Sequence, residues 1–88
     1  MPKTIHRPEY RTLIELLRRY REEAGLTQTQ CSKALNRSQS FMSDVENGSR
    51  RLDVVQLFDL CDLLGIRIAE LLEHIHALRS VTKKKRHR

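Results

Sequence analysis

At 88 residues, the chain is long enough for one domain but buries little apolar surface, which favours a compact helical bundle or an oligomer. It has no Trp and is dominated by Leu, which favours helices over strands, and its net charge of +6 suits a polyanionic partner. It lacks a nucleophile–base pair, a phosphate-binding glycine loop, an apolar membrane span and an apolar signal core, so we expect a cytoplasmic, nucleoid-associated protein that is not an enzyme.

The first predicted helix runs from Pro8 to Ala24 and follows an N-terminal arm at residues 1–7. Pro8 suits a first helical position, because its missing N–H would have no partner there. Apolar residues recur at helical spacing, and Gly25 is expected to end the helix in a left-handed conformation. Arginines are expected to balance carboxylates along this helix, with Arg18, Arg19 and Arg21 set against Glu15, Glu22 and Glu23.

The second predicted helix runs from about Thr27 to Leu35 and starts with a capping box. Thr27 is the N-cap, and Gln30 reaches back to its backbone N–H. Ser32 is small enough to let a neighbouring helix approach closely. Asn36 then ends the helix, since asparagine tolerates the left-handed conformation better than other residues with a side chain.

The third predicted helix runs from about Gln39 to Glu46, with Ser38 as its N-cap. Only Met42 and Val45 form a buried stripe, so the rest of its surface carries hydrogen-bonding side chains. A short helix with a free polar face, presented after a tight turn, suits the major groove of DNA. Phe41 lies one step from Met42 and is expected to press on a thymine methyl or a sugar, or else to cover the edge of the core.

Two further helices complete the predicted scaffold. The fourth, Val54–Leu64, begins with a capping box of Asp53 and Gln56 and ends at Gly65. Its apolar residues cover more than one face, which predicts a central place in the core. The fifth, Ile68–Leu78, carries one apolar stripe that either closes the core or pairs with a second copy of the chain.

The two cysteines are predicted to be buried and reduced. Cys31 and Cys61 both fall in helical apolar patterns, which indicates buried thiols rather than a disulfide or a metal pair. His74 and His76 are two positions apart on a predicted helix and do not share a face. We therefore expect no metal site and no cofactor.

Charge is distributed unevenly along the chain. Residues 1–52 carry a net charge of +4, residues 53–78 a net charge of −4, and residues 79–88 a net charge of +6. A basic face with an acidic back would orient the domain on a polyanion. The basic tail, residues 80–88, is predicted to be disordered in isolation. It solubilises the chain, contacts a partner or tracks phosphates beside a DNA site, and we favour the third reading.

Four short stretches stand at a spacing shared with a known family: Gly25-Leu26-Thr27-Gln28, Ser38-Gln39-Ser40, Val45-Glu46-Asn47-Gly48 and Leu63-Leu64-Gly65-Ile66. From roughly Leu13 to Leu72, the chain resembles the helix-turn-helix domain of the phage repressor and Cro type, also called the xenobiotic-response-element family. The resemblance implies an all-α, five-helix DNA-binding domain at residues 8–79, with the helix-turn-helix formed by its second and third helices. It also implies a homodimer on a near-palindromic, double-stranded operator, with half-sites about one helical turn apart.

The resemblance also assigns roles to side chains. Gln39 would read adenine through its amide, Ser40 would reach a base edge beside it, and Gln28 would grip the backbone and brace Gln39. The base-contact candidates are Gln39, Ser40, Ser43 and Asp44. The backbone-contact candidates are Thr27, Gln28, Lys33, Arg37, Ser38, Phe41, Asn47, Arg50 and Arg51.

Three residues depart from the family pattern. Asn36 replaces the turn glycine, which the turn accepts at small cost. Arg37 replaces an apolar residue and is expected to swing out towards phosphate, because it cannot be buried cheaply. Asp44 occupies a groove-facing position, where its carboxylate either accepts from cytosine N4 or repels phosphate, so the operator's base sequence stays open.

The predicted function is transcriptional regulation, as a homodimeric repressor that occludes a promoter. The apolar stripe of the fifth helix extends past the family's usual closure and supplies the candidate dimer contacts: Leu71, Leu72, Ile75 and Leu78. The alternative is an antitoxin-like module whose main role is to bind a second protein.

Overall fold

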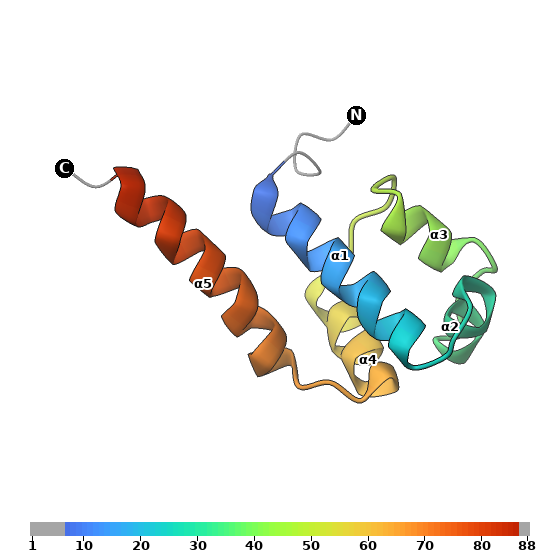
Figure 1. The fold of residues 1–88 in the computed structure, drawn as a ribbon. Helices are drawn as coiled ribbons and strands as arrows, with labels where there is room; N and C mark the ends of the chain where they lie inside the picture. Colours follow the sequence, from blue (N-terminus) through green and yellow to red (C-terminus); the bar gives the residue numbers. More distant parts are fainter. Residues whose placement is uncertain (1–6, 87–88) are drawn as a thin grey trace.

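The computed structural model describes the backbone of residues 7–86 and the side chains of residues 7–77. These residues form five helices and no strand (Figure 1). The helices are α1 (Pro8–Glu23), α2 (Gln28–Ala34), α3 (Phe41–Glu46), α4 (Val54–Leu64) and α5 (Ile68–Arg86). The predicted all-α, five-helix fold is therefore confirmed. Most of the predicted N-terminal arm, residues 1–6, lies outside the described residues, as do residues 87–88 of the predicted tail.

A single core joins all five helices. In Figure 1, α1 runs through the middle of the molecule, with α2 and α3 on one side and α5 on the other, and it packs against both α3 and α5. The short helices α2 and α3 pack on each other. Each helix contributes a side chain with no exposed surface: Leu17, Cys31, Met42, Val45, Leu60 and Leu71. The scaffold thus fixes the orientation of α2 and α3 through apolar contacts beneath them.

Both predicted capping boxes are confirmed. Thr27 Oγ1 accepts the Gln30 N–H at 3.0 Å, and Gln30 Oε1 accepts the Thr27 N–H at 2.9 Å. Asp53 and Gln56 make the same reciprocal pair at 2.8 and 3.0 Å. Asn36 takes the left-handed conformation expected of it, with φ of 60°, just beyond α2. The starts of α2 and α4 are therefore set by side chains local in sequence.

The start of α3 differs from the prediction. The helix begins at Phe41, two residues later than expected, and the predicted N-cap, Ser38, lies in the preceding turn. The serine at the observed N-cap position, Ser40, makes no capping bond with its side chain. Instead, the buried hydroxyl of Ser32 accepts the Met42 N–H at 2.9 Å. A residue of α2 thus satisfies an orphan donor of α3, which no local pattern reveals.

The prediction that α4 is central to the core is wrong in its extent. One face is buried through Leu57, Leu60 and Cys61. The adjoining face is open: Val54 is 65%, Val55 67% and Phe58 47% exposed. The apolar residues of α4 therefore form an exposed surface as well as part of the core.

The last helix is longer than predicted. It continues to Arg86, whereas the sequence analysis placed its end at Leu78 and disorder from residue 80. The added segment, residues 79–86, contains Arg and Lys, which are good helix formers, and neither Gly nor Pro. No helix among residues 7–86 is both long and apolar enough to cross a bilayer.

The two cysteines are free and buried, as predicted. Burial raises the pKa of both the Cys31 and Cys61 thiols above the ordinary value of 9.0. Both therefore stay protonated at neutral pH and behave as small apolar groups. Within the described part of the chain, no three His, Cys, Asp or Glu side chains gather into a possible metal site.

Candidate nucleic-acid interface

A buried ion pair links the first three helices behind the helix-turn-helix. Arg21 Nε donates to Glu46 Oε2 at 2.7 Å, and Arg21 Nη2 donates to Glu46 Oε1 at 3.1 Å. The two side chains are only 8% and 4% exposed. The amide of Gln28 donates to Glu46 Oε1 at 2.9 Å, and Arg21 Nη1 donates to the Leu26 carbonyl at 2.7 Å. The hydrogen bond to Glu46 raises the pKa of Arg21, which keeps the guanidinium protonated, and these hydrogen bonds satisfy the buried polar atoms of both side chains.

This network corrects one prediction. Arg21 was expected to balance carboxylates on its own helix, but its close partner is Glu46 of α3, and Glu22 lies only at the edge of ion-pair range, at 4.0 Å. The amide nitrogen of Gln28 donates to Glu46, and the bracing of Gln39 by Gln28 stays a prediction. The sequence signal for the Glu46 contacts lay in the Val45-Glu46-Asn47-Gly48 stretch: a carboxylate between a buried valine and a helix end needs a cation.

The N-terminal ends of α2 and α3 form an open groove lined entirely by uncharged polar residues. Its lining is Gln28, Thr29, Ser38, Gln39, Ser40 and Ser43. Gln39 and Ser40 are exposed in the turn before α3 rather than on the helix itself. The half-buried Ser43 donates its hydroxyl proton to the Ser40 carbonyl at 3.1 Å, which leaves its oxygen as an acceptor. The structure therefore gathers three of the four predicted base-contact residues on one surface.

Asp44, the fourth predicted base-contact residue, is half-buried and does not line this groove. Its backbone carbonyl accepts the N–H groups of Ser49 and Arg50 at 3.0 and 3.1 Å. These bonds fold the loop after α3 back onto the helix. Asp44 thus has a backbone role in positioning that loop, which the sequence analysis did not foresee.

Most of the predicted backbone-contact residues are exposed. The predicted backbone-contact residues that are exposed are Thr27, Lys33, Arg37, Ser38, Asn47, Arg50 and Arg51. Asn47 is oriented by its neighbour: its Oδ1 accepts the Ser49 N–H at 2.8 Å and the Ser49 hydroxyl at 2.7 Å. The carbonyl end of this side chain is therefore engaged within the loop, which leaves the amide nitrogen as a donor.

Phe41 was expected to press on a thymine methyl or a sugar, or else to cover the edge of the core. It is only 2% exposed and belongs to the core, which speaks against the favoured contact with DNA. The guanidinium carbon of Arg37 lies 4.9 Å from the centroid of its ring, and that of Arg50 lies 5.1 Å from the same centroid. Phe41 therefore does not reach a base or a sugar, but it contacts two of the predicted phosphate-binding residues.

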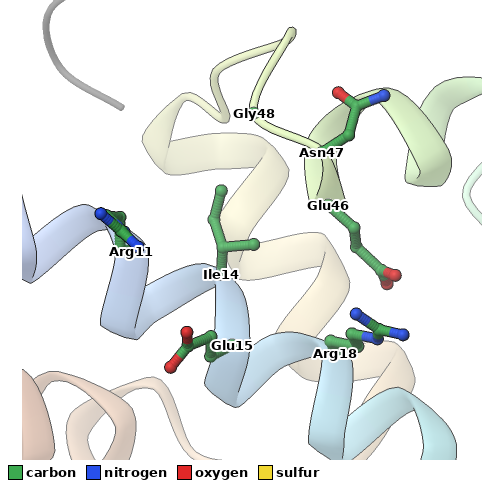
Figure 2. A pocket seen from close by; sticks show the side chains of 7 residues that line it. All are labelled: Arg11, Ile14, Glu15, Arg18, Glu46, Asn47 and Gly48. Carbon is green, nitrogen blue, oxygen red and sulfur yellow. The ribbon is translucent and has the colours of Figure 1, made fainter. Parts of the chain in front are cut away.

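A second groove lies between α1 and the end of α3 and holds arginines that the sequence analysis did not select (Figure 2). Its volume is about 270 Å³, and it is lined by Arg11, Ile14, Glu15, Arg18, Glu46, Asn47 and Gly48. Figure 2 shows Ile14 and Arg18 of α1 pointing towards the end of α3, whereas Glu15 points away from it. Arg18 is paired with Glu22 at 3.4 Å. The seven-residue spacing of Arg11 and Arg18, two turns along one face, was the available sequence signal. Because Glu15 and Glu46 also line this groove, their negative charges weaken it as an anion site.

Sequence comparison relates this geometry to known proteins. The protein-family model described as a helix-turn-helix domain matches residues 13–75. An uncharacterized HTH-type transcriptional regulator, y4dJ, of Sinorhizobium fredii (strain NBRC 101917 / NGR234) is 38% identical over 53 residues. That match covers 60% of this chain and 69% of the relative. Residues 13–75 include the polar groove, the second groove except for Arg11, and the α4 surface.

Solved structures show the same fold. An XRE-family like protein from Pseudomonas syringae pv. tomato strain DC3000 matches with a TM-score of 0.78 and 42% identity, over 86% of this chain and 93% of that one. The clp gene regulator ClgR from Corynebacterium glutamicum matches with a TM-score of 0.71 over 91% of this chain and 85% of that one. At 21% identity, the second likeness speaks for the fold alone.

Proposed function

Because this chain belongs to the xenobiotic-response-element type of helix-turn-helix family, whose members regulate transcription and are not enzymes, we propose that it binds a specific duplex DNA sequence as a homodimer and represses transcription by covering a promoter. The observation that carries this proposal is the uncharged polar groove at the starts of α2 and α3, together with exposed cations in the turn before α3 and the loop after it. Such a surface suits base edges at its centre and phosphates at its margins.

We expect the residues of the turn before α3 to contact the DNA bases. The amide of Gln39 can donate to adenine N7 and accept from N6, and the neighbouring Ser40 can bond to either kind of base. While the Ser43 hydroxyl donates to the Ser40 carbonyl, it can accept a hydrogen bond from a base but cannot donate one. Asp44 lies at the margin, where its carboxylate either accepts from cytosine N4 or repels phosphate.

We expect exposed hydrogen-bond donors and cations of the protein to contact the DNA backbone. Phosphate oxygens only accept, so the outward amide nitrogen of Asn47 and the cations Lys33, Arg37, Arg50 and Arg51 suit them. The basic tail, residues 80–88, would add salt-dependent affinity beside the operator. We therefore expect removal of residues 83–88 to weaken binding and reduce its salt dependence, while the preference for the operator is retained.

The proposed dimer surface on α5 is smaller than predicted from sequence. Leu71 has no exposed surface and packs within the core, so it cannot contact a partner. Leu72 is 49% exposed, and Ile75, one turn further on the same face, is half-buried. The side chain of Leu78 lies outside the described residues. A two-fold contact through Leu72 and Ile75 would present two copies of α3 to a near-palindromic operator.

Selection of bound duplexes from a random DNA pool, followed by sequencing, tests the proposed function. The proposal expects one enriched, two-fold symmetric sequence, with half-sites about one helical turn apart. Protein that carries Gln39→Ala should lose the enrichment while it keeps weak binding to any duplex. An enriched sequence without symmetry would overturn the dimer, and no enrichment at all would overturn specific recognition.

A protein-binding role is the second candidate, and the open face of α4 favours it. Val54, Val55 and Phe58 are neighbours on this helix and leave an apolar surface uncovered. Co-expression with the product of the adjacent gene would test the role. A stable complex that is lost on Phe58→Glu would support a partner at this surface, whereas purification of the chain by itself would count against it.

A further inference from the structure

One aromatic ring connects two of the proposed phosphate-binding residues. We propose that Phe41 is a positioning residue that holds Arg37 and Arg50 together as a two-arginine clamp for the phosphates of one DNA strand. The clamp rests on the proposed DNA-binding function and deepens it, because it assigns a coupled site to residues that sequence reasoning treated one by one. It also explains why this chain carries an arginine at position 37, where the resembled family has an apolar residue.

The ring brings together arginines from two different loops. Arg37 lies in the turn between α2 and α3, and Arg50 lies in the loop after α3. Their guanidinium carbons are 4.9 and 5.1 Å from the centroid of the Phe41 ring, within the range of a cation–π contact. Phe41 itself is 2% exposed and packs in the core, so the ring is a fixed support for two exposed side chains.

The backbones of both arginines are also anchored. The Arg37 N–H donates to the Ser32 carbonyl at 2.9 Å, directly after the left-handed residue that ends α2. The Arg50 N–H donates to the Asp44 carbonyl at 3.1 Å, and the Leu52 N–H, two residues further, donates to the Tyr10 hydroxyl at 3.3 Å. Each arginine is therefore held at two points: its backbone N–H is hydrogen-bonded and its guanidinium contacts the shared ring. This reduces the conformational entropy lost on binding.

The charges favour an anion at this place. Two guanidinium groups that contact one ring carry the same charge and repel each other, and an anion that binds both would relieve that repulsion. None of the ion pairs found within residues 7–77 involves Arg37 or Arg50. Asp59 is the nearby carboxylate: with Gln56 it lines a small cavity beside Arg37 and Phe41, but it is not within ion-pair distance of either arginine.

The clamp lies beside the reading surface. Arg37 immediately precedes Ser38, and Phe41 immediately follows Ser40, both of which line the polar groove. Residues of α4 line the cavity beside the clamp, so the clamp lies on the α4 side of the reading surface. Gln28, at the other end of α2, is hydrogen-bonded to Glu46 instead. Because the major groove of DNA is about 12 Å wide and is bounded by a phosphate strand on each side, a reading surface needs phosphate contacts at both margins. The clamp supplies them at the α4 margin.

The geometry can be tested without DNA by NMR of the free protein. A proton above an aromatic ring is shifted by the ring current, so the side-chain protons of Arg37 and Arg50 should resonate at displaced positions. Phe41→Leu should return both sets to ordinary values, whereas Phe41→Tyr, which keeps the ring, should retain the displacement. Ordinary resonances for both arginines in the unmodified protein would overturn the clamp, whether or not the protein binds DNA.

The function of the clamp is tested by fluorescence anisotropy with the selected operator. Arg37→Gln and Arg50→Gln should each weaken binding about tenfold and each lower the slope of log affinity against log salt by about 1. Phe41→Leu changes no charge, yet it should weaken binding about fivefold, since it releases both arginines. Arg67→Gln is the matched control: it removes an exposed arginine from the α4–α5 loop, so binding should change less than twofold.

Coupling separates positioning from a merely structural effect. Arg37→Gln and Arg50→Gln should each cost clearly less in a Phe41→Leu background than in the unmodified protein, because the shared support is already gone. Thermal unfolding identifies any variant that does not fold, and Phe41→Tyr should restore operator affinity to within about twofold. The clamp alone would be overturned if folded Phe41→Leu protein kept its affinity for the operator. It would also be overturned if each arginine substitution cost the same with and without Phe41→Leu. A protein that binds no duplex DNA would overturn both the clamp and the proposed function.

Discussion

The helix-turn-helix half of the molecule and the α4–α5 half expose opposite kinds of surface. The first presents uncharged polar side chains around Gln39, and these are backed by the buried Arg21–Glu46 ion pair. The second leaves large apolar side chains open, such as Val55 at 67% and Phe58 at 47% exposed. The polar surface of the first half suits a hydrated, charged partner such as DNA, whereas the apolar surface of the second suits another protein.

The two halves are also held together differently. In the first, polar bonds between helices fix the orientation: Glu46 receives bonds from both α1 and α2, and Ser32 of α2 receives a backbone N–H of α3. In the second, α4 and α5 are buried through apolar side chains such as Leu57, Leu60 and Leu71. Polar bonds between helices are directional, so they place the reading surface more tightly than apolar contacts would. Stability and DNA binding should therefore depend on the same few buried polar groups.

The largest expected effect is the loss of the buried ion pair. Arg21→Met leaves Glu46 as an uncompensated buried carboxylate, so the free energy of unfolding should fall by about 3–5 kcal/mol. Arg19→Met, on an exposed position of the same helix, should change it by less than about 0.5 kcal/mol. Urea denaturation of both variants measures the difference. Equal stabilities would mean that the pair does not hold the first three helices together.

The observed cap of α3 can be separated from the predicted one. Ser32→Ala removes the acceptor of the Met42 N–H and should lower the free energy of unfolding by about 1–2 kcal/mol. Ser38→Ala, at the position where sequence reasoning placed the cap, should lower it by less than about 0.5 kcal/mol. The same denaturation experiment compares the two. The reverse order would restore the local cap and contradict the inter-helix bond.

The apolar surfaces of α4 and α5 can be distinguished by added charge. If Leu72 contributes to the dimer, Leu72→Glu should weaken self-association by about tenfold or more in sedimentation equilibrium, because a carboxylate would be buried in the interface. Ala77→Glu adds the same charge at an exposed position on another face of α5 and serves as the control. Phe58→Glu should leave self-association unchanged. If only Phe58→Glu produces monomers, the two-fold contact lies on α4.

The smallest effect concerns the buried thiols. Because the folded-state pKa of Cys31 and of Cys61 is raised above 9.0, folding favours the protonated thiols. Their contribution to stability is fully present below pH 9.0 and is lost as the pH rises above that value, where the thiols of the unfolded chain ionise. The unfolding midpoint should therefore decline slightly in that range. Cys61→Ala should reduce the decline, and an unchanged slope would show that other groups cause it.

Sequence reasoning succeeded where the determining contacts are local. The boxes at Thr27 and Asp53 and the left-handed Asn36 depend on residues within three positions of each other, so the pattern alone predicts them. It was less successful where a contact crosses between helices. The cap of α3 comes from Ser32, ten positions away from its partner, and the counter-charge of Glu46 lies 25 positions away.

Burial was the other limit of the sequence analysis. Phe41 beside Met42 and Val54 beside Val55 both show adjacent apolar residues, and nothing in the pattern says which side chain faces the core. In the structure, Phe41 is buried and both valines are exposed. The polar candidates Gln39, Ser40 and Ser43 were found together because their neighbours in sequence are also their neighbours on one surface. Their roles in DNA recognition stay predictions.

Fluorescence anisotropy with DNA from upstream of the protein's own gene tests the central claim most directly. The unmodified protein and Gln39→Ala would be titrated in parallel, with scrambled DNA as competitor and thermal unfolding as the check on folding. The account predicts tight binding that survives the competitor and is lost in a folded Gln39→Ala variant. Equal, salt-sensitive binding of both proteins to both DNAs, repeated with the operator selected from the random pool, would contradict a reading surface at the start of α3.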